Sequence, residues 1–230
     1  RLTDGAETLL FNQVDYAIFD LFLLKRPNAE NDYTPEEAKY LRKEYESLDT
    51  IKKEQLIKNI LLALPGSDES FTLPEVKILI QSYKHIGGDQ LKSNLIQFLK
   101  EICPIAEEFG IQLAIHPDDP PFSVFGLPRI MSTNEDVDDL MHAIPSTANG
   151  LCFCSGSFGV RPDNDLIKMI KSWGTKIYFV HLRNTRRDEL GNFLEVPHLD
   201  GDTDMYAIMK ALVHLMFEEK RSIPMRPDHG

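Results

Sequence analysis

The spacing of apolar residues changes near residue 110. Before this point, apolar residues recur every three or four positions, first in residues 11–24 and most regularly in residues 89–109. That spacing is typical of helices that bury one face. After Gly110, short apolar runs alternate with amphipathic segments. The pattern predicts a helical first half followed by β-α-β-α units, an order that forms a parallel sheet with helices packed on it.

Residues that start and stop helices set the expected boundaries. Pro27 ends the first helix. Thr34, followed by Pro35 and Glu37, forms a capping box that starts a charged helical pair, which we expect to lie outside the core. In the second half we expect strands at 111–116, 149–154, 176–181 and 222–227, and helices at 133–144, 164–173 and 203–219.

Composition and charge exclude several classes of protein. The chain of 230 residues carries 36 acidic and 25 basic side chains, a net charge of −11. With no basic excess to neutralise phosphates, we expect no nucleic-acid partner. With no run of roughly 20 apolar residues, we expect no membrane partner. Three cysteines make no disulfide framework and suit a reducing cytoplasm. Both ends are abrupt, so we expect further residues on either side.

Potential metal ligands stand at the ends of the four expected strands: His116, Cys154, His181 and Asp228. The carboxyl ends of parallel strands in an α/β barrel meet at one mouth, where such folds carry their chemistry. Taken alone, each residue has an ordinary explanation as a loop residue, a buried cysteine, a core histidine or a polar turn. Because all four junctions carry ligand-type residues, the set indicates a metal site.

Neighbouring residues suggest supporting roles at this mouth. Asp118 or Asp119 could orient the His116 imidazole through its second nitrogen. Small residues follow Cys154, and they should leave its sulfur accessible.

Three further residues are candidates for contacts with a substrate. They are Ser155 after Cys154, Arg183 after His181, and His198 in a loop on the same side. Arg183 could bind a carboxylate in bidentate fashion. A structural salt bridge is an equally good explanation for Arg183, and both stay open.

The ligand types restrict the choice of metal. One thiolate, two imidazoles and one carboxylate form a borderline set that accepts Zn, Fe(II), Mn or Co. A Lewis-acid role beside four protein ligands requires the coordination number to rise toward five or six. Fe(II) and Mn(II) reach these numbers more readily than Zn, so we favour Mn2+ or Fe2+.

Several longer motifs resemble the mannonate dehydratase family of sugar-acid catabolism. They are KRPNAENDYT in the helical half, and HPDDPP, FGLPRI, NGLCFCSGS, YFVHLR, HLDGDTDMY and PMRPDHG in the second half. The resemblance implies a TIM (β/α)8 barrel of the xylose isomerase-like kind, with residues 34–66 belonging to an added helical excursion. Because family members are longer and begin with further βα units, residues 1–230 would form a single, partial barrel domain without the first strands.

The resemblance also implies an activity. Family members remove water from D-mannonate to give 2-keto-3-deoxy-D-gluconate, a hydro-lyase step of hexuronate (glucuronate) catabolism, and they use Mn(II) or Fe(II). The family's ligand motifs fall on His116, Cys154, His181 and Asp228, and its proposed acid/base histidine falls on His229. The family's second proton-transfer group, a tyrosine downstream of PDHG, has no counterpart in a sequence that stops at Gly230.

Other functions agree with parts of this pattern. A metal-dependent sugar isomerase or epimerase of the same barrel superfamily is the nearest alternative, although such sites favour carboxylate-rich ligands and often two metals. A cysteine hydrolase or transferase would use Cys154 with His181 or His229 and be indifferent to chelators. A binding module would hold a metal or a sugar acid without turnover. For the partners, we expect D-mannonate as a small-molecule substrate, and a homodimer because the outlying helices need a surface to pack on.

Overall fold

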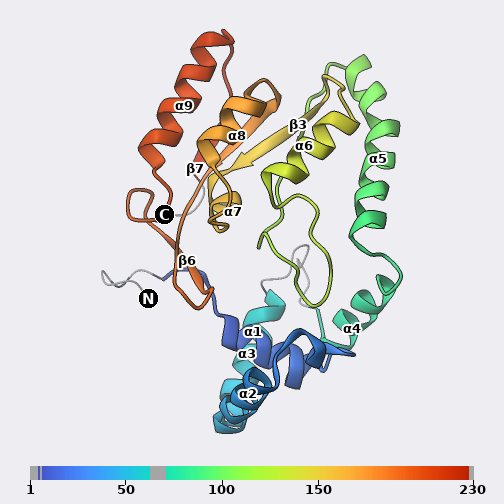
Figure 1. Cartoon of the computed structure of the whole chain (residues 1–230), viewed down its shortest axis with the longest axis vertical. Helices are drawn as coiled ribbons and strands as arrows, with labels where there is room; N and C mark the ends of the chain where they lie inside the picture. Colours follow the sequence, from blue (N-terminus) through green and yellow to red (C-terminus); the bar gives the residue numbers. More distant parts are fainter. Residues whose placement is uncertain (1–4, 6, 63–70, 228–230) are drawn as a thin grey trace.

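The computed structural model describes residue 5, residues 7–62 and residues 71–227. These residues form an α/β body with a group of helices at one end (Figure 1). Helices α1 to α4 make up that group, and the long helix α5 leads from it into the α/β body. The chain thus follows the expected order, with a helical first half and an alternating second half.

The α/β body is built on a parallel sheet with the strand order β2-β3-β4-β7. The strands are Leu113–Ile115 (β2), Asn149–Cys154 (β3), Ile177–Leu182 (β4) and Met225–Pro227 (β7). All four expected strands are confirmed, and so is the α/β class. Within the described residues the sheet is open, which is the arrangement that one part of a (β/α)8 barrel takes.

One helix precedes these strands, three connect them, and all four pack on the sheet. They are Gly88–Glu108 (α5), Asn134–Ala143 (α6), Leu166–Trp173 (α8) and Met205–Glu218 (α9). Each of α6, α8 and α9 begins at a side chain that accepts an amide hydrogen of the first turn, from Thr133, Asp165 and Asp204 respectively. These expected helices are confirmed. No helix in the described ranges is both long and apolar enough to cross a membrane.

Strand β3 shows how the sheet divides its two faces. Leu151 and Phe153 are fully buried in the core that the strands share with the helices. Burying side chains of this size stabilises the fold by about 1.5–3 kcal/mol each. Cys152 and Cys154 alternate with them along the strand and therefore point to the opposite face. The helix-covered face holds the body together, and the opposite face is free to carry chemistry at the strand ends.

The first expected helix is present, with one irregularity. An α-helical part, Gln13–Ile18 (α1), continues into a π-helical part, Phe19–Leu24 (η1). Lys25 takes a left-handed conformation with φ of 51° and ends the helix just before Pro27. The predicted helix over 11–24 is therefore confirmed from Gln13 to Leu24, whereas Phe11 belongs to a short strand and the wider helical turn at the end was not expected.

The charged pair consists of Pro35–Ser47 (α2) and Thr50–Leu62 (α3), and the capping box at Thr34 is present. The two helices bury little, with Leu41 and Leu61 as their buried residues. The last residues of the expected excursion over 34–66 lie outside the described residues.

An apolar cluster attaches the helical group to the α/β body. Leu61 of α3 and Val76 of the next helix, Leu73–Ser82 (α4), pack in one cluster with Phe19 and Phe125. Phe125 belongs to the long loop that follows strand β2. The helical group therefore rests on the loop that begins with His116, on the side of the body where the strands end (Figure 1).

The pattern of the sequence does not predict a second, antiparallel sheet that lies beside the first. Its strands are Leu10–Phe11 (β1), Asn184–Arg187 (β5) and Phe193–Val196 (β6), in the order β1-β6-β5. Strand β5 is wholly polar and β1 has two residues, so neither shows the alternation that identifies a strand. This small sheet joins the start of the chain to the hairpin between β4 and α9, and it places Glu195 beside the strand ends of the main sheet.

Candidate metal centre

Three of the four predicted ligands meet at the carboxyl end of the parallel sheet. One ligand atom each of His116, Cys154 and His181 lies within 4.8 Å of the others. His116 follows β2, Cys154 is the last residue of β3, and His181 lies near the end of β4. Pairing of the strands sets Cys154 directly beside His181. The expectation that these residues converge at one mouth is confirmed by this geometry.

The fourth predicted ligand, Asp228, and the predicted acid/base residue His229 lie outside the described residues. The chain is described up to Pro227, which pairs with Leu182, the residue after His181. Strand β7 therefore runs to the same edge of the sheet as the three residues that meet there.

The imidazole of His116 is oriented by the main chain. Its Nδ1 lies 2.7 Å from the carbonyl oxygen of Pro117, and a hydrogen on Nδ1 donates to that oxygen. The other nitrogen, Nε2, then faces His181 Nδ1 at 3.2 Å. A second-nitrogen contact of this kind is the usual way in which proteins fix the ring of a ligating histidine.

The two aspartates expected to orient this ring have other partners. Asp118 accepts hydrogen bonds from the amides of Ile130 and Met131 and from the hydroxyl of Ser132. Asp119 pairs with Arg183. The prediction that either carboxylate orients His116 is wrong, because the adjacent carbonyl of Pro117 already fills that position.

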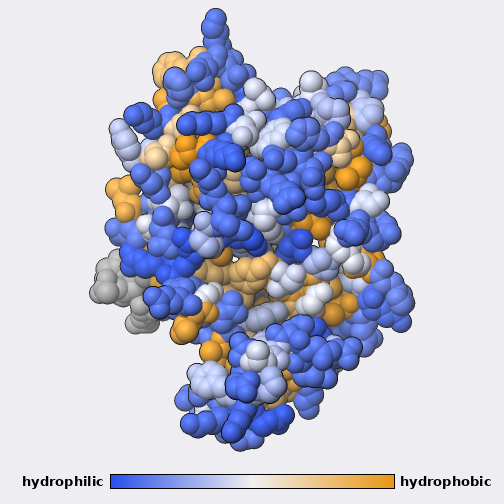
Figure 2. Space-filling view, viewed as in Figure 1, coloured by the Kyte–Doolittle hydropathy of each residue, from blue (hydrophilic) through white to orange (hydrophobic). Residues whose placement is uncertain are grey.

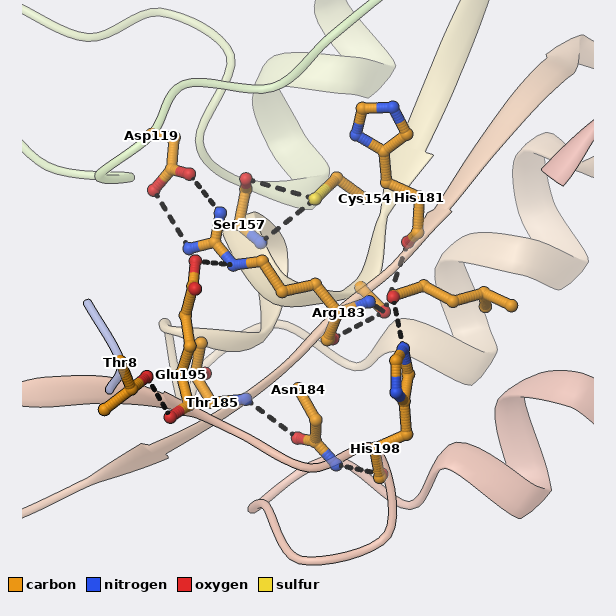
Figure 3. A network of polar contacts seen from close by, with 12 residues as sticks. Thr8, Asp119, Cys154, Ser157, His181, Arg183, Asn184, Thr185, Glu195 and His198 are labelled. Carbon is orange, nitrogen blue, oxygen red and sulfur yellow. Dashed lines mark hydrogen bonds and ion pairs between the residues drawn. The ribbon is translucent and has the colours of Figure 1, made fainter. Parts of the chain in front are cut away.

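Cys154 is fully buried, so the expectation of an accessible sulfur is also wrong. The small residues after it do not open a turn but form a short helix, Ser155–Gly159 (α7), whose N-cap is Cys154. The sulfur accepts hydrogen bonds from the amide of Ser157 at 3.4 Å and from its hydroxyl at 3.2 Å (Figure 3).

The charges of Cys154 and His116 depend on each other. Burial raises the pKa of the Cys154 thiol, but hydrogen bonds from His116 and Ser157 outweigh this effect and hold the pKa below its ordinary value. Burial lowers the pKa of His116, but the Cys154 thiolate, the carbonyl of Pro117 and the charge of Asp119 together outweigh burial, so that the pKa is raised. Both shifts favour the thiolate, which is the form of cysteine that binds metal ions.

Arg183 occupies the centre of the polar network in Figure 3. Its guanidinium is buried and pairs with Asp119, while its Nε lies 3.3 Å from Glu195 Oε1, without the alignment of a hydrogen bond. Of the two roles left open by the sequence, the salt bridge is the one observed. With two carboxylates on one guanidinium, a substrate carboxylate would have to displace a protein partner.

The two other predicted substrate contacts are placed differently from each other. Ser155 is fully buried, and its hydroxyl donates to the carbonyl of Arg183 at 2.8 Å and accepts from the Arg183 amide at 3.0 Å. It therefore joins the end of β4 to α7, and its hydroxyl is engaged by the main chain. His198 is half-buried, and its Nε2 donates to the carbonyl of Leu182 at 2.7 Å, so that its ring lies beside strand β4.

A recess of about 240 Å³ separates the α/β body from the helices below it. Asp119, Pro120 and Arg129 line one side, and residues of α1 and α3 line the other. Figure 2 shows hydrophobic colouring gathered where the two parts of the molecule meet, on a face that is otherwise mostly hydrophilic. Because Asp119 lines the recess and belongs to the same loop as His116, the recess adjoins the candidate metal centre.

Two residues of this network were not predicted. Ser157 donates to the ligand sulfur, and Glu195 pairs with Arg183 from the unpredicted strand β6. Ser157 stands three residues after Cys154, the N-cap of a helix. This is a position whose amide commonly bonds to an N-cap side chain, and it is the signal that could have identified Ser157. Glu195 carries no comparable signal in the sequence.

The ligand set meets the requirements of a divalent metal ion. Ligand atoms that share one ion at bond lengths of about 2.0–2.3 Å lie roughly 3–4 Å apart. The 3.2 Å between His116 Nε2 and His181 Nδ1 is within this range. Two imidazoles and a thiolate are ligands that Zn, Fe and related ions accept. His116, Cys154 and His181 therefore form a possible metal site.

Comparison with known proteins identifies the family of this chain. A sequence profile of the D-mannonate dehydratase (UxuA) family matches residues 1–230. Mannonate dehydratase of Saccharophagus degradans is 44% identical over 236 residues, which cover 100% of this chain and 59% of that protein. Mannonate dehydratase of Marinomonas sp. is 45% identical over 238 residues, 100% of this chain and 60% of that protein. The chain thus spans about 60% of the length of these relatives.

A solved structure also resembles this fold. The mannonate dehydratase from Streptococcus suis serotype2 matches 67% of this chain and 44% of its own, with a TM-score of 0.60 and 38% sequence identity. The match of the profile over every residue, together with these relatives, establishes the relationship. The chain belongs to the D-mannonate dehydratase (UxuA) family.

Proposed function

We propose that the protein carrying this chain is a mannonate dehydratase, which removes water from D-mannonate to give 2-keto-3-deoxy-D-gluconate in hexuronate catabolism. The convergence of His116, Cys154 and His181, whose ligand atoms lie within 4.8 Å of one another, is the observation that carries the proposal. Curated relatives named mannonate dehydratase support it.

In this proposal His116, Cys154, His181 and Asp228 hold one divalent ion. When bound, the ion would act as a Lewis acid that neutralises charge beside the substrate carboxylate. We propose Mn2+ or Fe2+, because a site with four protein ligands must still admit substrate oxygens.

Dehydration of a sugar acid requires the transfer of two protons. A base takes the weakly acidic proton beside the carboxylate, and an acid delivers one to the departing hydroxyl. His229 directly follows the proposed ligand Asp228 and is therefore our candidate for one of these transfers. His116 and His181 are engaged as ligands in this scheme, which leaves His229 as the histidine assigned to proton transfer.

The surroundings of Cys154 argue against the cysteine hydrolase considered above. A nucleophilic cysteine needs an exposed sulfur, whereas Cys154 is fully buried and accepts two hydrogen bonds from Ser157. A sugar isomerase would differ from the dehydratase in its product, and a binding module would form no product. The homodimer and the cytoplasmic location stay predictions.

Product analysis of the full-length protein tests the proposal. Incubation with D-mannonate should yield a 2-keto-3-deoxy acid, treatment with EDTA should abolish this activity, and Mn(II) or Fe(II) should restore it. An isomerised sugar as product would indicate an isomerase or epimerase. Turnover that survives EDTA but is lost on alkylation would indicate a cysteine hydrolase, and binding without product a binding module.

Replacing His229 tests the proposed proton transfer. His229→Asn should lower turnover of D-mannonate by about 10²-fold or more, because it removes a titratable group from the reaction. The metal content should stay that of the unaltered protein, since His229 is not a proposed ligand. Steady-state kinetics and elemental analysis on the same sample make the comparison, and unchanged turnover would reject the role.

A further inference from the structure

The sulfur of Cys154 is held by a second residue that is not itself a ligand. Both the amide and the hydroxyl of Ser157 donate to Sγ, at 3.4 Å and 3.2 Å. Both residues are fully buried, so water does not compete for these contacts. Figure 3 shows the two donors converging on the sulfur from one side. The His116 and His181 rings supply the other two ligand atoms of the centre.

We propose that Ser157 is a positioning residue of the metal centre, whose amide and hydroxyl together orient the Cys154 thiolate and limit the negative charge that the sulfur donates to a bound ion. This inference rests on the metal-dependent function proposed above. Hydrogen bonds to an ionised acceptor are about twice as strong as those between neutral groups. Two such bonds in a buried site fix the direction in which the remaining sulfur lone pairs point.

The position of Ser157 is itself fixed by the packing of helix α7. The Arg183 side chain lies across Gly156, where a Cβ atom would come within 2.6 Å of Arg183 Nε. On the other side, a Cβ at Gly159 would come within 2.7 Å of Thr203 Oγ1. The two glycines let α7 sit tightly between strand β4 and the loop before α9. The donors of Ser157 are therefore in place before a metal ion arrives, and the ion does not have to order them.

A hydrogen bond to a metal-bound thiolate draws electron density from the sulfur. The sulfur then transfers less charge to the ion, which keeps more of its Lewis acidity for the substrate. A serine that merely filled space would have no such effect, and alanine would replace it. The energy of the sulfur-to-metal charge-transfer absorption reports the difference directly, because it measures how easily the thiolate gives up an electron.

The experiment uses the full-length protein loaded with Co(II), which gives a visible thiolate charge-transfer band. In Ser157→Ala the band should move to lower energy, because the hydroxyl that stabilised the thiolate is gone. Co(II) should also be retained about 10-fold less tightly, because the sulfur loses a contact that orients it and this loss outweighs the stronger donation of the thiolate; the size is the lower end of the 10–100-fold typical of residues that support a ligand. Ser157→Thr keeps the hydroxyl and should restore the band. Far-UV circular dichroism checks that each variant is folded.

Ser155→Ala is the matched control. Ser155 is equally buried in the same helix, but its hydroxyl bonds to the main chain of Arg183 and, at 3.3 Å, to the carbonyl oxygen of His181, and not to the sulfur. Its removal should leave the band where it is in the unaltered protein. A folded Ser157→Ala protein with the original band and the original Co(II) retention would overturn the inference.

The outcome is separable from that of the proposed function. If the unaltered protein binds Co(II) with a thiolate band but forms no product from D-mannonate, the dehydratase proposal fails and the role of Ser157 stands. If the unaltered protein shows no thiolate band with Co(II), Cys154 is not a ligand, and the inference about Ser157 is overturned even where the protein turns over D-mannonate.

Discussion

Replacing Cys154 by serine is expected to strip the protein of its metal ion and abolish turnover of D-mannonate. The substitution exchanges a thiolate for a neutral hydroxyl of nearly the same size at the end of β3. Metal binding should weaken by more than about 100-fold, since even residues that only support a ligand contribute 10–100-fold. Elemental analysis after dialysis measures the effect, and the product assay on the same sample shows whether activity follows the metal.

The neighbouring cysteine provides the control for this result. Cys152 lies on the same strand and the same face and is also buried, but it does not belong to the group of three ligand atoms. Cys152→Ser introduces the same hydroxyl two residues earlier on the strand. The protein with this substitution should keep its metal. If Cys154→Ser retained the metal and the activity of the unaltered protein, Cys154 would not be a ligand and the proposed centre would be wrong.

Replacing Arg183 by methionine is expected to destabilise the fold by about 3 kcal/mol, the low end of the range for breaking a buried ion pair. Methionine keeps most of the side-chain volume but leaves the carboxylates of Asp119 and Glu195 without their cation. The side chain of Glu195 is 10% exposed and that of Asp119 is 34% exposed. Water can therefore compensate Asp119 in part, which limits the loss. Urea denaturation of the metal-free protein measures the free energy of unfolding without a contribution from bound metal.

A surface arginine makes the comparison specific. Arg187 also pairs with a carboxylate, that of Asp202, but both side chains are about 30% exposed. Arg187→Met should therefore cost about 1 kcal/mol or less, as exposed salt bridges do. Equal losses for the two variants would mean that the Arg183 network contributes nothing beyond an ordinary surface pair.

The arrangement around Arg183 also connects the fold to the site. The guanidinium joins the loop after β2, through Asp119, to strand β6 of the small sheet, through Glu195. His116 begins that same loop. Arg183 comes directly after strand β4, which carries His181. A single side chain thus connects the segments that carry two of the proposed metal ligands, so we expect the Arg183→Met protein to lose part of its metal affinity as well.

Much of the architecture could be predicted from local patterns. The four strands of the main sheet and helices α5, α6, α8 and α9 follow from apolar spacing and from residues such as Thr133 that cap a helix. Such signals are local because they depend on neighbours within one turn or one strand. The small sheet escaped prediction because strand β5 is polar throughout and is held in place by β6, its partner in a hairpin.

The meeting of the candidate ligands could be predicted from the sequence, but not the residues that support them. His116, Cys154 and His181 stand at strand ends, and the rule that parallel strands end at one edge brings them together. Which group orients His116, whether the sulfur of Cys154 is exposed, and what Arg183 binds were each decided by packing. Pro117, Ser157 and Glu195 have these roles because of where the folded chain places their polar atoms.

The sequence by itself determined the alternation of strands and helices and the identity of the residues that can bind a metal ion, because side-chain type and spacing are properties of the chain. Only the tertiary structure decided that Arg183 forms a buried ion pair and that Cys154 is buried at the start of a short helix. Both outcomes depend on contacts between residues far apart in the chain, such as Arg183 with Asp119, and a linear pattern contains no record of which distant groups will meet.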